Sequence, residues 1–547
     1  MKRFFFLLIM LLASAGASAQ IASNLYWVQF SDKAGTPYSL DNPEAYLSPR
    51  ALERRARLGI PIDEYDLPIN PVYLQAVSDC GAELVNPSKW LNGVSVYTTN
   101  PAVVEAINAL PFVVAVRDCP HDPKAQELKQ RWLAEEMQVV EPVRATCGFY
   151  GGASTQISQI RGDYLHGQGF WGEGMVIAVL DGGFIGADTH PVFDKMREEG
   201  RLLGTRSFLR GQPSVYTQSS HGCSCLSTMA GYVPDTFVGT APKASYYLIL
   251  TEQGDYENII EEYNWVSGAE YADSLGVDVC TTSLGYIDFD MSEWNHPFEH
   301  FDGHTAPMTV GGEIAVSRGM LCLVAAGNEG DSWGGGCTLG IPGDAEHMLT
   351  VGAVNSSGQR AYFSSVGPTY DGRIKPDVMA MGEGTYVAAN DSYYNGNGTS
   401  YATPVMAGAA TCLWQANPMA TVNEICEALR QCGNHASNPD KYYGYGIPNL
   451  EHAMQMLHVE DTFAPSNEII KIYPNPSQGR IHVVLQEGYH ADIQIYDVTG
   501  RHLKDYHFNG LNHSSLETYL NGLDNGLYLI KADSERGSQT ERILLNR

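Results

Sequence analysis

Four residues of this chain are of the types that acyl-transfer chemistry requires, in the order Asp181, His221, Asn328 and Ser400. A serine hydroxyl attacks a carbonyl carbon when a histidine takes its proton and a carboxylate holds that histidine in the right tautomer. An asparagine amide can stabilise the oxyanion that the attack creates. The order Asp, His, Ser is one of several in which this geometry occurs. The four residues therefore predict an acyl-transfer enzyme with a serine nucleophile.

Ser400 also has a simpler interpretation. It follows Gly398 and Thr399 and precedes a run rich in small apolar residues at 402–410, which is typical of a helix that enters a packed core. A serine at such a place is often only the N-cap of the helix. The same place favours developing negative charge, because a helix N-terminus has free N–H groups and the positive end of the helix dipole. Since the other three residues supply the partners of a nucleophile, we favour the nucleophile.

Short apolar segments with helical stretches between them indicate the fold that positions these residues. Such strands imply a parallel sheet covered on both faces, that is, a doubly wound α/β fold. In these sheets the active site lies at the carboxyl ends of the strands, which is where Asp181 and Asn328 fall. The expected strands are 176–180, 246–250, 277–280, 321–326 and 349–354.

The composition is that of an exported globular protein with several domains. The chain has 547 residues, 44% of them hydrophobic, and a net charge of −28. This charge argues against nucleic acid or an anionic membrane surface as a partner. Residues 1–19 have the pattern of a secretory signal peptide, with a short apolar run between Lys2-Arg3 and Ala17-Ser18-Ala19. No later run is long and apolar enough to predict a transmembrane span.

The eleven cysteines are an odd number, so at least one thiol stays free. In an exported protein the others can pair. Cys426 and Cys432 are close enough in sequence to form a disulfide. Cys280, Cys322 and Cys412 lie in apolar segments, which predicts buried thiols.

The surroundings of the four residues resemble the motifs of subtilisin-like serine proteases (subtilases, peptidase family S8), over about residues 156 to 457. The resemblance implies a subtilisin-like sheet, a triad of Asp181, His221 and Ser400, and Asn328 as the oxyanion donor. It implies no required cofactor and no catalytic metal, and it leaves a structural calcium ion open. The matching motifs are Val179-Leu180-Asp181-Gly182-Gly183, His221-Gly222, Ala325-Ala326-Gly327-Asn328-Glu329-Gly330 and Gly398-Thr399-Ser400-Tyr401-Ala402-Thr403-Pro404.

The same resemblance locates a substrate pocket. Two short segments would form the walls of the S1 pocket, and Gly340, before an Ile341–Pro342 bond that the resemblance implies is cis, would lie at its base. Small walls leave a deep pocket, so we expect a broad, apolar P1 preference, with a basic P1 residue beside Glu329 as the alternative. The expected pocket residues are Ser283, Leu284, Gly285, Ala325, Ala326, Gly327 and Gly340.

The residues after His221 depart from the usual family pattern. Cys223-Ser224-Cys225 replaces it, and Cys225 lies one helical turn after His221 on the same face. Some subtilases have a cysteine beneath the catalytic histidine, which predicts inhibition by mercurials. The alternatives are a disulfide that includes Cys223 or Cys225, or inert burial.

A second motif, His296-Pro297-Phe298-Glu299-His300, spells a zinc-binding pattern. Pro297 argues against the continuous helix that would hold the metal. We therefore expect a surface insertion and no metal site.

Residues 20–150 are predicted to be an αβ unit and a polar linker, with strands at 26–30, 94–98 and 113–116 and helices at 43–58 and 101–109. By itself this unit suits a small structural or binding domain. It resembles the pro-segment of exported subtilases of Bacteroidetes-type bacteria, which implies an intramolecular inhibitor that is cut off between about residues 120 and 155. The catalytic domain would then be 151–458.

Residues 459–547 are predicted to be a linker and a small β-sandwich, with strands at 481–485, 491–497 and 526–531. The opening Tyr473-Pro474-Asn475-Pro476-Ser477 and the strands resemble the sorting domain of type IX secretion. This resemblance implies that the type IX secretion machinery is a partner. It also implies that the protein crosses the periplasm and is then released or attached to the outer-membrane surface. The alternative is a carbohydrate-binding or adhesive domain.

These predictions describe a secreted serine endopeptidase that acts on protein or peptide substrates. The alternative is a catalytically silent surface protein that binds partners on a subtilase scaffold. The complete set of Asp181, His221, Asn328 and Ser400 argues against that alternative.

Overall fold

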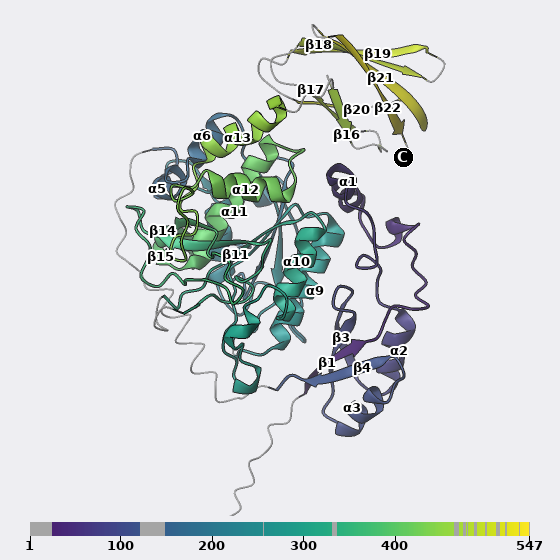
Figure 1. Ribbon diagram of the computed structural model, residues 1–547, viewed down its shortest axis with the longest axis vertical. Coiled ribbons are helices and arrows are strands. Elements are labelled where there is room, and N and C mark those ends of the chain that lie inside the picture. The colour runs from purple at the N-terminus through teal and green to yellow at the C-terminus, as the bar shows by residue number, and fades with distance from the viewer. Residues whose placement is uncertain are drawn as a thin grey trace, which may run out of the picture.

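The described residues form three separate hydrophobic cores: a large central one, one near the N-terminus and one near the C-terminus. Figure 1 shows the corresponding parts of the chain in teal and green, in purple and in yellow. The predicted signal peptide and most of the region expected to contain the cut lie outside the residues that the structure describes. This computed structural model describes residues 24–120, 148–254, 256–330, 336–463, 470–473, 477, 480–485, 490–497, 500–509, 515–519, 522–534 and 537–545.

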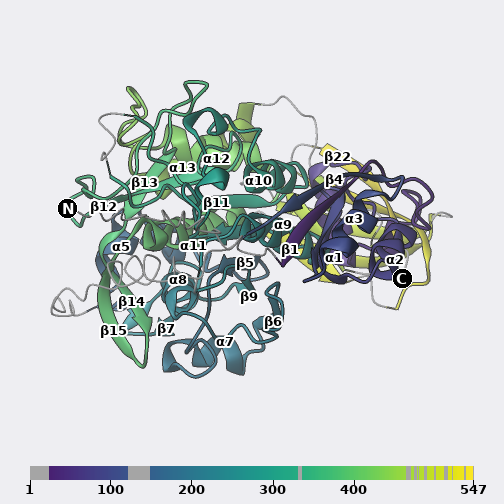
Figure 2. The ribbon, with the colours of Figure 1, turned by 90° about the horizontal axis from the view of Figure 1, so that it is seen from below.

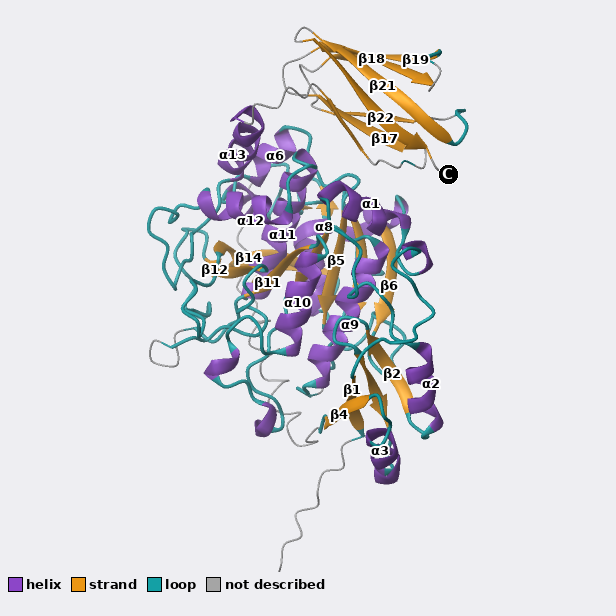
Figure 3. Ribbon diagram, turned by 45° about the vertical axis from the view of Figure 1, so that its right-hand side comes forward, coloured by secondary structure: helices purple, strands orange, loops and turns teal. Residues whose placement is uncertain are grey.

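The central unit contains a seven-stranded sheet in the order β13-β12-β11-β10-β5-β9-β6, in which all neighbouring strands are parallel (Figure 3). Strands β5, β11 and β12 are buried along their whole length, which is why their sequences are almost entirely apolar. The doubly wound α/β prediction is confirmed. The strands are β5 (Val176–Asp181), β6 (Leu202–Ser207), β9 (Ser245–Leu250), β10 (Val279–Thr282), β11 (Leu321–Ala325), β12 (Leu349–Val354) and β13 (Val378–Met381).

Helices flank this sheet. Helices α8 (His221–Ala230) and α11 (Thr399–Ala416) pack against each other, and α9 (Ile260–Leu275) packs against α10 (Pro307–Ser317). Near-complete burial of α8 and α11 explains their many small residues. The remaining elements are α5 (Ser154–Ser158), α6 (Gly162–Gly167), α7 (Asp194–Glu198), α12 (Val422–Gln431), α13 (Leu450–Phe463), β7 (Tyr232–Val233), β8 (Phe237–Val238), the hairpin β14 (Glu383–Ala389) and β15 (Ser392–Asn397), and the 3₁₀ turns η2 (Pro191–Phe193), η3 (Ser292–Trp294) and η4 (Phe298–His300).

Strand β5 lies between β9 and β10, and the order of connection reverses there. The chain leaves β5, adds β6 and β9 on one side, and then adds β10 to β13 on the other. In open parallel sheets such a switch point opens a crevice at the carboxyl ends of the strands. The ends of β5, β10 and β11 are therefore where a site is expected.

The N-terminal unit (residues 24–120) contains an antiparallel sheet of order β2-β3-β1-β4 and lies beside α9 (Figure 2). The predicted helix 43–58 is wrong as one element, because Ser48 caps a new helix that begins at Pro49. A proline fits the first turn of a helix but not its interior. The elements are β1 (Leu25–Phe30), η1 (Pro43–Ala45), α1 (Pro49–Leu58), α2 (Pro71–Asp79), β2 (Glu83–Ser88), β3 (Gly93–Tyr97), α3 (Pro101–Asn108) and β4 (Val113–Asp118).

The C-terminal region is β-rich, as predicted, with antiparallel sheets of order β16-β17-β20 and β19-β18-β21-β22. Alternate side chains of these strands form its own core. The strands are β16 (Ile470–Tyr473), β17 (Arg480–Leu485), β18 (His490–Asp497), β19 (His502–Asn509), β20 (Ser515–Tyr519), β21 (Gly526–Ser534) and β22 (Gly537–Leu545).

All ten cysteines in the described part of the chain are free thiols. Cys426 and Cys432, although close enough in sequence to bridge, form no disulfide, and the Cys432 thiol donates to the Leu429 carbonyl (3.4 Å). The burial predicted for Cys280, Cys322 and Cys412 is confirmed. The Ile341–Pro342 bond is cis, as the resemblance implies. A search of the described helices finds none with the length and hydropathy of a membrane span.

Candidate active site

Asp181 and His221 meet where β5 ends and α8 begins. Asp181 is the last residue of β5 and is fully buried, and His221 is the first residue of α8. The Nδ1–H group of His221 donates to Asp181 Oδ1 at 2.8 Å. A carboxylate bound at Nδ1 leaves Nε2 as the ring nitrogen that can take a proton. The pair has the arrangement of a general base and the group that orients it.

The missing side chain of Gly222 allows this close approach. The Gly222 N–H group donates to the Gly183 carbonyl at 2.9 Å. A Cβ atom at position 222 would lie 2.6 Å from that oxygen and 2.9 Å from Asp181 Cβ. Any larger residue would push the start of α8 away from the end of β5.

The charges around His221 favour its protonated form. Burial alone would lower the pKa of His221, but the carboxylate of Asp181 and the neighbouring Cys225 raise this pKa well above 6.5. We attribute the rise to Asp181, because burial also raises the pKa of Cys225 and so keeps it a neutral thiol.

Ser400 is the second residue of α11, and Gly398 is the N-cap. The interpretation of Ser400 as only an N-cap is therefore wrong. Its side chain is buried, and it lies in the first helical turn, where backbone N–H groups have no intrahelical acceptor.

The backbone carbonyl of Ser400 has unusual partners. Pro404, four residues later, has no N–H group to donate to this carbonyl. The Ser283 hydroxyl (2.8 Å) and the Cys225 thiol (3.2 Å) donate to it instead. Residues from α8 and from the end of β10 therefore fix the first turn of α11. We did not predict this role for Ser283 or Pro404, although the spacing of Pro404 from Ser400 is a readable signal.

Asn328 follows β11 and is held by Thr399. Its Oδ1 atom accepts from the Thr399 N–H group (2.9 Å) and from the Thr399 hydroxyl (3.0 Å). These two donors assign the amide orientation, so the NH₂ group, which can only donate, lies on the other side. The sequence motifs predict Asn328 but not its dependence on Thr399.

Cys225 lies beneath the imidazole of His221, as predicted. Its sulfur is 3.9 Å from Nε2 and 4.0 Å from Nδ1. The Cys223 thiol points elsewhere, toward the Ala388 carbonyl (3.8 Å), so the disulfide alternative is wrong. Potential metal-ligand atoms of Asp181, His221 and Cys225 lie within 4.8 Å of one another. A thiophilic metal bound there would compete with the Asp181–His221 hydrogen bond.

The structure brings the expected pocket segments together. A Cβ atom at Gly285 would lie 3.3 Å from Gly340 Cα, and the Gly340 N–H group donates to the Ala326 carbonyl at 3.0 Å. Ser283 to Gly285 follow β10, and Ala325 to Gly327 follow or end β11. Both segments thus lie at the carboxyl ends of strands, near Ser400 and Asn328.

His296 contacts both His300 and Glu262 of α9. His296 Nε2 is 2.5 Å from Glu262 Oε1 on α9, and its Nδ1 is 3.2 Å from His300 Nδ1. Glu262 Oε2 also accepts from the Met308 N–H group (3.0 Å). The segment forms only the short turn η4, but His296 is buried, so the expected surface insertion is anchored to α9.

Three family models match the chain. The Subtilase family model matches residues 172–446, which include all four predicted catalytic residues. The model for the Peptidase S8 propeptide domain of Bacteroidota matches residues 25–132. The model for the secretion system C-terminal sorting domain matches residues 471–546.

Curated relatives agree with these matches. Subtilisin NAT of Bacillus subtilis subsp. natto is 33% identical over 345 residues, which are 62% of this chain and 78% of that protein. Subtilisin of Bacillus pumilus is 33% identical over 55% of this chain and 98% of that protein. Serine protease AprX of Bacillus subtilis (strain 168) is 29% identical over 55% of this chain and 71% of that protein.

Proposed function

The chain belongs to the subtilase family and is a serine-type endopeptidase, and on this premise we propose that Ser400, His221 and Asp181 hydrolyse peptide bonds through an acyl-enzyme. His221 takes the Ser400 proton as the hydroxyl attacks, and returns it to the leaving amine. Asp181 holds the imidazole and stabilises its charged form. Water then attacks the acyl-enzyme, with His221 again taking and returning a proton, and the Ser400 hydroxyl is restored.

Asn328 is the proposed side-chain donor to the oxyanion. Thr399 occupies its Oδ1 atom, so the amide group cannot easily rotate when the substrate binds. A preorganised donor costs no reorganisation during the reaction, which is the main source of its effect. The N–H groups of the first turn of α11 lie beside it as further donors.

The N-terminal and C-terminal units have roles other than catalysis. The N-terminal unit is a pro-segment of the family type, and the sorting domain directs export by type IX secretion, with release or attachment at the cell surface. We propose that the pro-segment inhibits the enzyme until it is cut, that residues 1–19 are a signal peptide, and that an apolar P1 side chain enters the Ser283–Gly327–Gly340 pocket. The proposed reaction uses no cofactor. Activity and melting temperature in EDTA would measure the contribution of a structural calcium ion.

The observation that carries this proposal is the buried Asp181–His221 hydrogen bond beside the first turn of α11. A serine-reactive fluorophosphonate should label Ser400 in protein freed of its pro-segment. Labelling should disappear in His221→Ala and persist in His452→Ala, a substitution of an exposed histidine on α13. An adduct on another serine, or normal labelling of His221→Ala, would contradict the proposal.

A further inference from the structure

The catalytic domain has a buried carboxylate whose partners come from the pro-segment. Asp273, on α9, is fully buried. Within the described residues, every side-chain hydrogen bond that it accepts comes from Arg54, Arg55 or Lys89 of the pro-segment. A buried, unpaired carboxylate is costly. Asp273 is therefore explained by binding to the pro-segment and not by the packing of the catalytic domain.

The guanidinium groups of Arg54 and Arg55, both on α1, donate to the carboxylate of Asp273. Arg54 donates to Asp273 Oδ1 and to the Val277 carbonyl, and Arg55 donates to Asp273 Oδ2 at 3.0 Å and to the Arg318 carbonyl at 2.6 Å. Both arginine side chains are at most 2% exposed. A planar guanidinium group matches this mixture of carboxylate and carbonyl acceptors, whereas a lysine ammonium group does not.

A second carboxylate extends the same surface. Asp278, just before β10, pairs with Arg50 and lies 3.5 Å from Arg57. Arg50 also donates to the Gly276 and Gly174 carbonyls, each at 2.9 Å, and Arg57 donates to the Pro418 carbonyl at 2.6 Å. Four arginines of one helix thus meet carboxylates and main-chain carbonyls of the catalytic domain.

Gly276 allows the backbone of α1 to lie against the end of α9. It ends α9 in the left-handed conformation, with a φ of 80°. A Cβ atom there would lie 2.5 Å from the Ala51 backbone nitrogen. The Ser48 N–H group also donates to the Ser274 carbonyl at 2.9 Å. The end of α9 is therefore shaped to the backbone of α1 as well as to its side chains.

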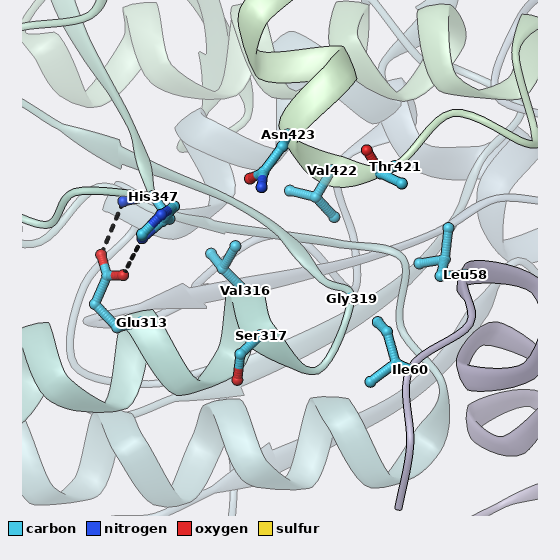
Figure 4. Close-up of a pocket in the computed structure, with 10 residues that line it drawn as sticks. All are labelled: Leu58, Ile60, Glu313, Val316, Ser317, Gly319, His347, Thr421, Val422 and Asn423. Atoms are coloured by element: carbon cyan, nitrogen blue, oxygen red, sulfur yellow. Dashed lines mark hydrogen bonds and ion pairs between the residues drawn. The ribbon is translucent and has the colours of Figure 1, made fainter.

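A cavity lies beside the apolar side chains at the end of α1. Leu58 and Ile60 form one wall of a cavity of about 390 Å³, and the catalytic domain forms the other wall (Figure 4). Side chains that face a cavity lose dispersion contacts on that side. The charged contacts of α1 therefore act together with the apolar contacts that Leu58 and Ile60 make beside this cavity.

The sheet of the pro-segment makes a separate contact with α9. Trp27 stacks on Tyr263 with a centroid distance of 4.3 Å, and Glu270 accepts from the N–H groups of Lys89 (2.8 Å) and Trp90 (3.0 Å). These contacts involve β1 and the β2–β3 turn, not α1. The pro-segment thus contacts α9 through two sets of residues, which meet at Lys89, since its ammonium group also lies 3.5 Å from Asp273 Oδ2.

We propose that Asp273, Asp278 and the neighbouring carbonyls form a guanidinium-binding exosite, outside the catalytic cleft, whose ligand is the arginine helix α1. Its guanidinium contacts set the rate at which the cut pro-segment leaves the catalytic domain. Release vacates the exosite on the processed enzyme. The inference rests on the proposed role of the pro-segment as an inhibitor, but its test measures binding alone.

The test uses the full chain with Ser400→Ala, so that its outcome does not depend on catalysis, and with a site for a sequence-specific protease inserted between Pro120 and Gly148. After cutting, the release rate of the N-terminal fragment is measured by size exclusion or surface plasmon resonance. Arg54→Lys with Arg55→Lys should speed release at least about tenfold, because charge is kept but the buried fork geometry is lost.

Glu83→Gln is the matched control. It removes an exposed ion pair with Arg210 (2.6 Å) across the same interface, and exposed pairs contribute little, so release should change less than about threefold. L-Arginine should also speed release from the unsubstituted cut chain more than L-lysine does at equal ionic strength. Arg57→Lys replaces the double variant if the latter does not fold. Equal release in the lysine variant and the control, or equal effects of the two amino acids, would overturn the exosite.

Discussion

A histidine that is hydrogen-bonded to a buried carboxylate keeps its proton to higher pH than an exposed histidine does. In its proposed role as the general base, His221 must be neutral, and Asp181 raises its pKa well above 6.5. We therefore expect kcat/KM to rise with pH in a range above 6.5, and to be low where His221 is protonated.

The substitution Asp181→Asn should move that rise to lower pH, because the charge that raises the pKa is gone. It should also lower kcat by about 10⁴-fold, the loss known for the corresponding change in another serine protease, because the tautomer is no longer fixed. The measurement is the pH dependence of kcat/KM for both proteins. An unchanged acid limb in Asp181→Asn would show that Asp181 does not set the pKa.

Cys225 gives a second prediction for a single residue. Burial raises the pKa of its thiol, so alkylating reagents that need a thiolate should react slowly at neutral pH. Mercurials form strong bonds to sulfur and should inhibit, because a metal on Cys225 Sγ would displace the His221 ring 3.9 Å away.

The substitution Cys225→Ser should abolish this inhibition, whereas Cys223→Ser should leave it intact, since the Cys223 thiol faces Ala388. Residual activity after stoichiometric addition of a mercurial is the measurement. Full activity of the unsubstituted enzyme with mercury bound to Cys225 would refute the prediction.

At the scale of elements, α8 can approach β5 only because position 222 has no side chain. Gly222→Ala would place a Cβ atom 2.9 Å from Asp181 Cβ. Overpacking of a buried contact costs about 1–3 kcal/mol of the free energy of unfolding. It should also lengthen the Asp181–His221 hydrogen bond and lower kcat more than it raises KM.

Gly167→Ala is the control, because a Cβ atom at this position of α6 would meet nothing within 4 Å. Thermal unfolding and steady-state kinetics would compare the two variants. If Gly222→Ala matched the control in both measurements, the close approach of α8 to β5 would not matter for catalysis.

Local patterns predicted most elements of the catalytic domain. Continuous apolar runs identified β5, β9, β11 and β12, because strands buried on both faces have no polar side to obscure them. The prediction of one helix at 43–58 was wrong, because it placed Pro49 inside the helix. A proline fits the first turn of a helix but not its interior, and α1 begins at Pro49.

At the scale of the whole molecule, export and catalysis belong to different units. The sorting domain has its own core, and all four proposed catalytic residues lie in the subtilase match. A chain ending at Phe463 should therefore lose export in the producing bacterium. The same truncated protein, made and processed in vitro, should keep kcat/KM within about twofold, since removal of an independent unit leaves distant sites unchanged.

Activity assays of cell fractions and culture medium, with the full chain as the control, would test this. Normal export of the truncated chain would mean that another segment carries the sorting signal. Loss of activity in vitro would mean that the C-terminal unit contributes to the active site.

The sequence alone determined the parallel sheet and was enough to propose the catalytic side chains and the three-part organisation, because each depends on local spacing: an apolar run, a motif at a strand end, a change in periodicity. Only the tertiary structure decided that Cys426 and Cys432 form no disulfide, that Ser283 and Cys225 donate to the Ser400 carbonyl, and that Asp273 accepts hydrogen bonds from the arginines of α1. Those features join residues far apart in the chain or depend on the direction of a side chain. Sequence spacing does not contain that information, since it arises when the sheet and its helices pack.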